Sequence, residues 1–209
     1  MMSPRSGVAH NIRTDKIRAG NSMKSLVAVS GLVLEKDVYT AVVADKEQKC
    51  VSIPHVVRVV NKSCFERSLA KRVALPIHLQ EIRNSAFYHI AVREVHIPKN
   101  VSHIKEHSFE FCDFLQTVTF AQGSQLKSIG SFAFSYCDKL KNISFPNGLE
   151  EIGFCSFSDS GLMKVTIPDS IKKVEDNAFP KRACIIWPDT YAPKGLLTAN
   201  MVRDMLCGQ

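Results

Sequence analysis

The sequence has no hydrophobic run long enough to cross a membrane. Its 209 residues contain no stretch of 18 consecutive apolar residues, so no membrane-spanning helix is expected. The segment most like a secretory signal, residues 23–34, begins well inside the chain and is broken by Ser30 and Gly31, and we interpret it as a strand. Translation starting at Met23 would favour a signal peptide instead. Otherwise, the absence of a clear signal favours a cytoplasmic protein.

Motifs of the common catalytic and nucleotide-binding sites are also missing. The chain contains no G-x-S-x-G nucleophile motif, no phosphate-binding P-loop and no dinucleotide-binding fingerprint. We therefore expect a protein that is not an enzyme and that carries no cofactor.

Positive charge is scarce outside the N-terminal region. The net charge is +7 at pH 7, and the first 30 residues, with five basic residues and one acidic residue, carry more than half of it. The charge on the rest of the chain is too dilute for a nucleic-acid surface, so no specific nucleic-acid partner is expected. Residues 1–30 are predicted to form a basic, flexible N-terminal extension.

Cysteine is too thinly spread for a disulfide scaffold. The chain has 7 cysteines in 209 residues, whereas small secreted domains that depend on disulfides contain many closely spaced pairs. An odd number also leaves at least one thiol unpaired within the chain.

A repeat of about 22 residues runs through the middle of the sequence. Phenylalanine recurs at intervals of 22, 22, 25, 23 and 22 residues, each time directly after Ala, Ser or Cys. A Val or Ile precedes each phenylalanine by five residues, and a Val, Leu or Ile stands three residues before that one. Self-similarity at such an interval is typical of solenoid proteins. The recurring phenylalanines are Phe65, Phe87, Phe109, Phe134, Phe157 and Phe179.

Each repeat contains a short alternation of apolar and polar residues, usually followed by proline. Such alternation predicts a short strand with one buried side, and the proline, which lacks a backbone N–H donor, ends it. A strand of three residues cannot bury its apolar side alone, so the repeats are expected to stack as coils whose strands pair in parallel. The predicted strands lie in residues 51–54, 73–76, 95–98, 118–120, 143–146, 165–168 and 185–188.

The repeat also defines the organisation of the chain. Residues 51–188 are predicted to form the solenoid, and the 25-residue interval is attributed to a loop at residues 121–125 that bulges outward. Residues 31–50 keep the strand alternation without the phenylalanine and are predicted to form an N-terminal cap. Residues 189–209 are predicted to form a C-terminal cap or tail, with helical spacing near the end of the chain.

The combined pattern L-x-x-I-x-x-x-A-F-x-x-C-x-x-L-x-x-V-x-I-P, matched most fully by residues 126–146, resembles the BspA-type (Treponema-type) leucine-rich repeat. The resemblance implies a leucine-rich repeat solenoid, a right-handed curved superhelix with a short-stranded parallel β-sheet on its concave face, little helix and capped ends. Members of that family are commonly surface-exposed adhesion or host-interaction proteins that bind other proteins. By resemblance, the chain would be a surface-antigen-like protein at the cell surface or secreted.

The most metal-like cluster is formed by His103 and His107, with Cys112 nearby. On a helix, two histidines four residues apart could bind zinc, but Ile104 between them belongs to the inward aliphatic positions, so the segment lies in a coil and no metal site is expected. Cys112 and Cys137, each three residues after a repeat phenylalanine, are interpreted as small buried hydrophobic residues. A redox pair or disulfide between neighbouring coils is the alternative.

The strand alternation predicts which side chains face outward. They form a polar, hydroxyl-rich strip with scattered charges, which suits hydrogen-bonded recognition of a protein, or of a glycan. The predicted partner-binding residues of the concave face are Arg72, Glu94, His96, Thr117, Thr119, Asn142, Ser144, Lys164 and Thr166.

The function that these features favour is non-catalytic protein recognition by a monomeric repeat module. The alternative is an intracellular repeat scaffold without a dedicated ligand, in which the outward strip is only a solvated sheet face.

Overall fold

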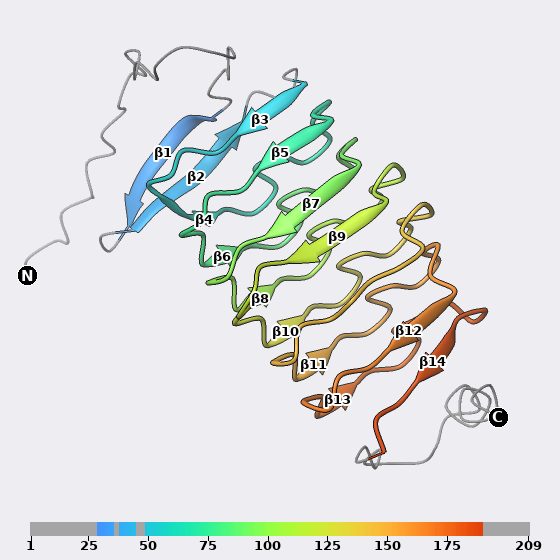
Figure 1. The fold of residues 1–209 in the computed structure, drawn as a ribbon. Helices are drawn as coiled ribbons and strands as arrows, with labels where there is room; N and C mark the ends of the chain where they lie inside the picture. The colour runs from blue at the N-terminus through green and yellow to red at the C-terminus, as the bar shows by residue number, and fades with distance from the viewer. Residues whose placement is uncertain (1–28, 36–37, 45–48, 190–209) are drawn as a thin grey trace, which may run out of the picture.

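The computed structural model describes residues 29–35, 38–44 and 49–189, and in these ranges the chain winds into a stack of coils that contains strands and turns but no helix (Figure 1). Accordingly, none of the described segments forms a helix that could cross a membrane. The strands are β1 (Val29–Glu35), β2 (Val38–Ala44), β3 (Cys50–Ser52), β4 (Val57–Val60), β5 (Arg72–Ala74), β6 (Glu81–Ile82), β7 (Glu94–Ile97), β8 (His103–Ile104), β9 (Thr117–Phe120), β10 (Ser128–Ile129), β11 (Glu151–Ile152), β12 (Lys164–Thr166), β13 (Lys173–Val174) and β14 (Cys184–Ile186).

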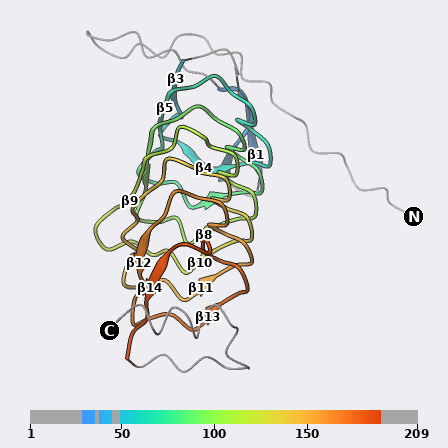
Figure 2. The ribbon, with the colours of Figure 1, turned by 90° about the vertical axis from the view of Figure 1, so that its right-hand side faces the viewer.

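The coils present strands on two opposite sides of the stack (Figure 2). One side, called the front face, consists of β3, β5, β7, β9, residues 142–146, β12 and β14. The other side is an eight-stranded sheet, called the rear sheet, in the order β1-β2-β4-β6-β8-β10-β11-β13. A turn edge, formed by the turns around the recurring phenylalanines, connects the rear sheet to the next front-face strand.

The rear sheet is the continuous backbone ladder of the fold. From β2 onward all of its strands are parallel, and equivalent residues of successive coils face one another, as Ile104, Ile129 and Ile152 do. The sequence predicts that the Val or Ile five residues before each repeat phenylalanine points inward, but it does not predict a strand there. Most of these strands are only two residues long, and they exist because identical segments lie alongside them.

The front face forms strands where the sequence predicts them, with one exception. Its strands pair only in twos, as β3 with β5, β7 with β9 and β12 with β14. Residues 143–146 form no strand, so the prediction of a strand there that pairs with both neighbouring coils is wrong. The loop that follows β9 is two residues longer than in neighbouring coils, and a hollow takes the place of ladder hydrogen bonds between β9 and the next coil.

An antiparallel hairpin closes one end of the rear sheet. Strand β1 pairs with β2 in antiparallel fashion, and β2 pairs in parallel with β4, the rear strand of the first repeat. The hairpin thus lies where the N-terminal cap is predicted, although its capping role stays a prediction. The predicted extension before residue 29 and the predicted cap or tail after residue 189 lie outside the described residues.

The recurring phenylalanines form one stack of parallel rings through the stacked coils. Successive ring centroids lie 5.1–5.6 Å apart with interplanar angles of 2–9°. This spacing matches the separation of neighbouring strands, about 4.8 Å, because each coil adds one ring and one strand to the stack. The five rings from Phe65 to Phe157 are almost completely buried, and Phe179 at the end of the stack is partly buried. The predicted aromatic column is therefore confirmed.

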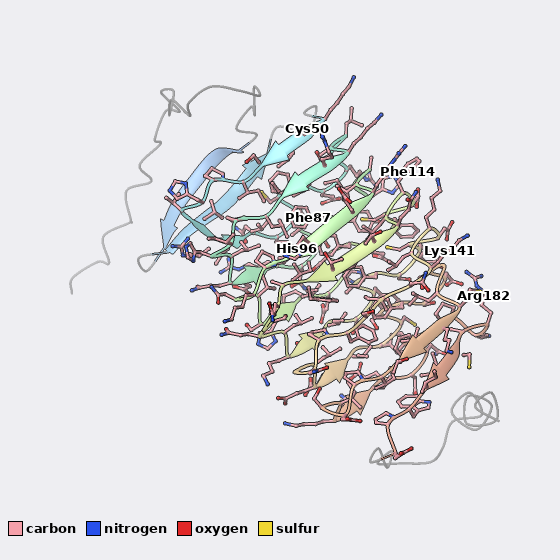
Figure 3. All side chains as sticks on the ribbon, in the orientation of Figure 1. Cys50, Phe87, His96, Phe114, Lys141 and Arg182 are labelled. Atoms are coloured by element: carbon pink, nitrogen blue, oxygen red, sulfur yellow. The ribbon has the colours of Figure 1, made fainter. Side chains whose placement is uncertain are left out.

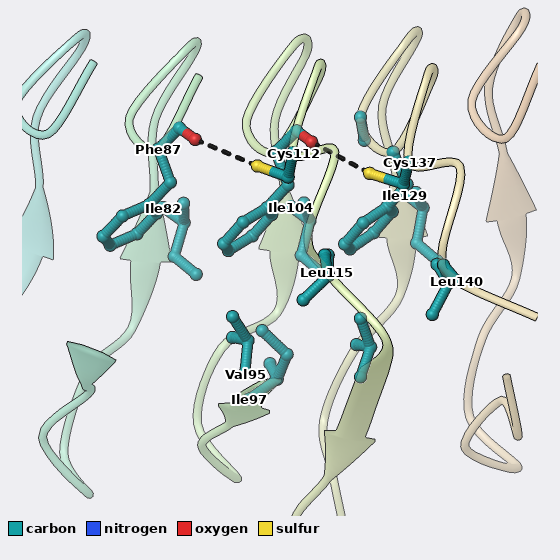
Figure 4. Close-up of a cluster of buried hydrophobic side chains, with 14 of the residues drawn as sticks. Ile82, Phe87, Val95, Ile97, Ile104, Cys112, Leu115, Ile129, Cys137 and Leu140 are labelled. Carbon is teal, nitrogen blue, oxygen red and sulfur yellow. Dashed lines mark hydrogen bonds between the residues drawn. The ribbon is translucent and has the colours of Figure 1, made fainter. Parts of the chain in front are cut away.

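The aliphatic and cysteine positions fill the rest of the core (Figure 4). Cys112 and Cys137 are completely buried free thiols, and each donates a hydrogen bond through Sγ to a backbone oxygen of the preceding coil, at Phe87 and Phe109 respectively. Burial raises the pKa of the Cys137 thiol well above its usual value, so it stays protonated. Both cysteines thus act as small core residues, and the disulfide alternative is wrong for this pair.

The turn edge depends on a repeated backbone conformation. Non-glycine residues two positions before and two positions after the buried phenylalanine have positive φ angles of 51–58° in one coil after another. This left-handed conformation lets the N–H of the phenylalanine donate to the next coil, as Phe134 does to the backbone oxygen of Ser156 at 2.7 Å. Hydrogen bonds along the stack thus offset the strain of these turns.

Charged side chains also form a ladder across coils beside the rear sheet. Glu150 accepts hydrogen bonds from Lys127 and Lys172, which lie one coil before and one coil after it, at 2.7 and 2.5 Å. The two ammonium groups lower the pKa of Glu150 to about 2 from its ordinary value of 4.5. A carboxyl with a lowered pKa in the folded state stabilises that state above its ordinary pKa, and this contribution is lost as the pH falls towards 2.

The pH dependence of stability should report this ion pair. Glu150→Gln removes the carboxylate, so the variant is expected to have a lower Tm than the wild type at neutral pH, with the difference shrinking between pH 4.5 and 2. Thermal unfolding followed by circular dichroism across this range measures it. Glu151→Gln is the matched control, since Glu151 forms no ion pair in the described part of the chain. A Tm difference for Glu150→Gln that stays constant with pH would contradict the assignment.

Candidate functional site

All nine predicted partner-binding side chains lie on the front face and are exposed. His96 on β7 is labelled among them in Figure 3. The nine side chains come from strands β5, β7, β9 and β12 and from residues 142–146, five successive coils of the stack. Apolar residues alternate with them and point into the core, as Val95, Ile97, Val118 and Val165 do. The alternation thus supplies both the buried side of each strand and its exposed polar side. Their role in binding a partner stays a prediction.

These side chains occupy two equivalent positions of successive coils, and the register between neighbouring coils is observed where β7 pairs with β9. Glu94 lies beside Thr117 and His96 beside Thr119 in the parallel pair of β7 and β9. The imidazole Nδ1 of His96 is 2.9 Å from Oγ1 of Thr119, so neighbouring coils also interact at this position. One row of equivalent positions contains Arg72, Glu94, Thr117, Asn142 and Lys164, and the other contains His96, Thr119, Ser144 and Thr166.

A hollow of about 610 Å³ opens in the front face between two neighbouring coils. It is lined by β9, by residues 121–124 of the loop that follows β9, and by residues 142–148 of the next coil. Four of the predicted residues, Thr117, Thr119, Asn142 and Ser144, line it, whereas the other five lie on the face around it. The structure therefore divides the predicted strip into a part that lines the hollow and a part that lies outside it.

The residues of the loop and the next turn that complete the hollow lie outside the strand alternation from which the site residues are predicted. Gln122, Ser124 and Asn147 line it, and none of them lies on a strand. The signal that could have found them is the 25-residue interval together with Gly123, whose φ of 68° shows that the loop turns in a left-handed conformation there. This loop forms one wall of the hollow.

A row of partly exposed aromatic side chains on the turn edge is a second feature that the sequence analysis missed. The rings of Phe111 and Tyr136, two positions after the buried phenylalanines, stack at 4.5 Å between centroids, and Tyr136 is 42% exposed. Phe114, 48% exposed, lies beneath the ammonium of Lys139 at 4.7 Å from the ring centroid. The repeat does not predict these rings, because the same position is Arg67 in the first coil and Asp159 in a later one.

The histidines of the metal-like cluster contact other side chains. Nδ1 of His103 lies 2.7 Å from Oγ of Ser128, and Nδ1 of His107 lies 2.8 Å from Oε2 of Glu110. The imidazole of His107 also stacks on Phe132, with 5.1 Å between ring centroids. In the part of the chain that the structure describes, no three or more histidine, cysteine or acidic side chains gather closely enough to hold a metal ion.

Stacked coils with a parallel rear sheet, short front strands and an inward aromatic column define a leucine-rich repeat solenoid. Residues 58–185 match the model of the BspA type leucine rich repeat region in 6 copies. The chain belongs to the BspA-type leucine-rich repeat family, which confirms the resemblance found in its sequence.

Two solved structures show the same fold over most of this chain. A leucine-rich repeat protein from T. pallidum is 26% identical, with a TM-score of 0.54 over 72% of this chain and 64% of its own. A leucine-rich repeat protein from Eubacterium ventriosum is 22% identical, with a TM-score of 0.53 over 79% of this chain and 53% of its own. The chain thus spans less than two thirds of either protein. Among curated proteins, none matches it.

Proposed function

We propose that this leucine-rich repeat protein is a non-catalytic recognition module that binds a protein partner through its front face. The observation that supports the proposal is the exposure of polar and charged side chains at equivalent positions of five successive coils. The stacked core beneath fixes the spacing of these positions, so a partner loses little binding energy to ordering them. Leucine-rich repeat domains generally use such repeated surfaces for protein interactions, which agrees with the family of this chain.

The charged members of the rows are available to a partner. In the described part of the chain, neither Glu94 nor Lys164 forms an ion pair, and the guanidinium of Arg72 donates a hydrogen bond to Sγ of Cys50 at 3.1 Å. Charges of both signs arranged along a rigid face favour selection of a partner with complementary charges over steep non-specific attraction. This arrangement suits specific recognition better than a solvated scaffold face.

Reversing two of these charges should weaken partner binding without unfolding the protein. The double variant Glu94→Lys with Lys164→Glu places like charges opposite each other in the complex, and we expect an affinity at least about tenfold lower, since such juxtaposition costs several kcal/mol. The full chain and its variants are immobilised, exposed to extracts of the source organism and of its surroundings, and the captured proteins are quantified by mass spectrometry. Affinity for the partner so identified is then measured with purified protein.

The turn edge provides the matched control. Tyr136→Ser removes an exposed side chain from the turn edge, a different side of the stack, and should leave capture at the wild-type level. The Tm of the double variant should stay close to that of the wild type, because surface changes usually alter stability by less than about 0.5 kcal/mol. A partner retained by the double variant but lost with Tyr136→Ser would move the interface to the turn edge and contradict the proposal.

A further inference from the structure

The hollow in the front face has the size of a small-molecule site. Its volume of about 610 Å³ falls within the range of about 300–1,000 Å³ that is usual for ligand pockets. Strand β9 and residues 142–148 form two of its sides, and the long loop after β9 forms a wall. The other front-face strands pair directly in twos at β3 with β5, β7 with β9 and β12 with β14.

None of the residues that line the hollow has a charged side chain. The lining is nonetheless rich in hydroxyl and amide groups, which both donate and accept hydrogen bonds. Charged residues lie on the front face outside it, among them Glu94 and Lys164. The ammonium of Lys99 lies beside Gly123 of the loop but is not part of the lining. A ligand held by the lining itself is therefore expected to be uncharged and to carry many hydrogen-bonding groups.

Most of these polar side chains are available. Thr119 contacts His96, and Oγ of Ser124 accepts a hydrogen bond from the N–H of Leu126 at 3.3 Å. The remaining polar side chains of the lining form no hydrogen bond with other described residues: Thr117, Gln122, Asn142, Ser144 and Asn147.

The backbone beside the hollow is also available for hydrogen bonds. The N–H and C=O groups of residues 142–145 form no hydrogen bond within the described part of the chain, whereas backbone groups of the paired front-face strands form ladders. Backbone polar groups need partners, which are water or a ligand when the protein supplies none. A ligand that replaces this water must itself carry hydrogen-bond donors and acceptors close to one another.

Apolar surface completes the lining. Phe120 and Phe145 are partly buried, and Val118 and Ile143 lie beneath them in the core. Phe120 makes no ring contact with another aromatic side chain among the described residues. A saccharide has this same division, with hydroxyl groups around its rim and C–H groups on its ring faces, so it can contact both kinds of surface at once.

From these features we propose that the hollow binds an uncharged saccharide of a few sugar units, held by the hydroxyl, amide and backbone groups of residues 117–124 and 142–148. This inference rests on the proposed function, since it gives the chemistry that the centre of the recognition face selects. The saccharide is either a free oligosaccharide or the sugar chain of a glycoprotein partner. An extended peptide would also satisfy the unpaired backbone of residues 142–145, so binding of unglycosylated peptides is one of the outcomes that the test below distinguishes.

Binding of defined sugars tests the proposal. The full chain is screened against immobilised neutral oligosaccharides built on lactose, maltose and chitobiose, each with a sialylated or uronic-acid counterpart, and affinities are measured by titration calorimetry. We expect binding of at least one neutral sugar and at least tenfold weaker binding of its acidic counterpart. Asn142→Asp adds a charge at constant size, and Phe120→Ala removes apolar surface. Each substitution should lower the affinity for the neutral sugar at least tenfold.

The control variant is Gln80→Glu, which adds the same charge at an exposed position of another coil, outside the hollow, and should leave sugar binding unchanged. Three results would each overturn the proposal. The first is that no neutral sugar binds, and the second is that Asn142→Asp and Phe120→Ala leave sugar binding unaffected. The third is that unglycosylated peptides bind and that both variants abolish this binding.

Experiments with the captured partner protein distinguish the two sources of sugar, and they also distinguish failure of the saccharide inference from failure of the proposed function. If enzymatic removal of its sugar chains abolishes binding, and Asn142→Asp does the same, the hollow holds the sugar of a glycoprotein. If a free sugar binds in the hollow while removal of the sugar chains has no effect on the partner, the ligand is a free oligosaccharide. If the deglycosylated partner still depends on Glu94 and Lys164, and no sugar binds, the saccharide inference fails while the proposed protein-binding function stands.

Discussion

Replacing Phe134 with alanine is expected to lower the free energy of unfolding by about 3–5 kcal/mol, the usual cost of truncating a buried aromatic residue. The ring is completely buried and lies between Phe109 and Phe157, each 5.2 Å away between centroids. Its removal leaves a cavity in the middle of the stack and takes a partner from both neighbouring rings. Urea unfolding followed by circular dichroism measures the change in free energy.

An exposed phenylalanine one coil away serves as the control for this prediction. Phe114 is 48% exposed and contacts the ammonium of Lys139, so Phe114→Ala should cost less than about 1 kcal/mol, the size of an exposed cation–π contact. Equal effects of the two substitutions would show that the aromatic stack does not carry the stability of the solenoid.

Replacing Gly161 with alanine is the second substitution with a large expected effect. A Cβ atom at this position would overlap the backbone oxygen of Asp138 in the preceding coil and would lie 3.0 Å from its carbonyl carbon. The obstacle is backbone, which cannot rotate away, so the two coils must separate and strain their stacking contacts. We expect a loss of about 1–3 kcal/mol or more, as for other overpacked interiors, measured by urea unfolding.

Gly148 is the matched glycine for this experiment. A Cβ atom added there would lie 3.8 Å from the nearest backbone oxygens, those of Leu126 and Ser124, which is ordinary van der Waals contact. Gly148→Ala should therefore change the free energy of unfolding by less than about 0.5 kcal/mol. If Gly161→Ala proved as mild as Gly148→Ala, the close backbone approach at Asp138 would not be present in solution.

The sequence predicts most of the core because the repeat places the same residue type at the same point of every coil. The six phenylalanines could be assigned to one buried column, and their rings do stack. The rear sheet was not predicted, since strands such as Glu81–Ile82 are too short to show alternation. Their strand geometry comes from hydrogen bonds to neighbouring coils and not from their own two residues.

The candidate site was predicted in part for a similar reason. Alternation alone indicates that side chains such as Thr117 and Ser144 point away from the core, and they are exposed. It gives no information on the distance between coils, so it could not predict that residues 143–146 stay unpaired or that a hollow opens beside them.

The sequence by itself determined which side chains each coil buries and which it exposes. Residues repeated at a fixed interval lie one above another in a stack of coils, so an apolar residue type kept at one position forms a buried column. The tertiary structure decided how closely each coil approaches the next, since that separation depends on loop length, on backbone contacts such as the one at Gly161 and on hydrogen bonds that no single repeat contains. The repeat therefore determines which residues the front face exposes, whereas the longer interval between two coils produces the hollow.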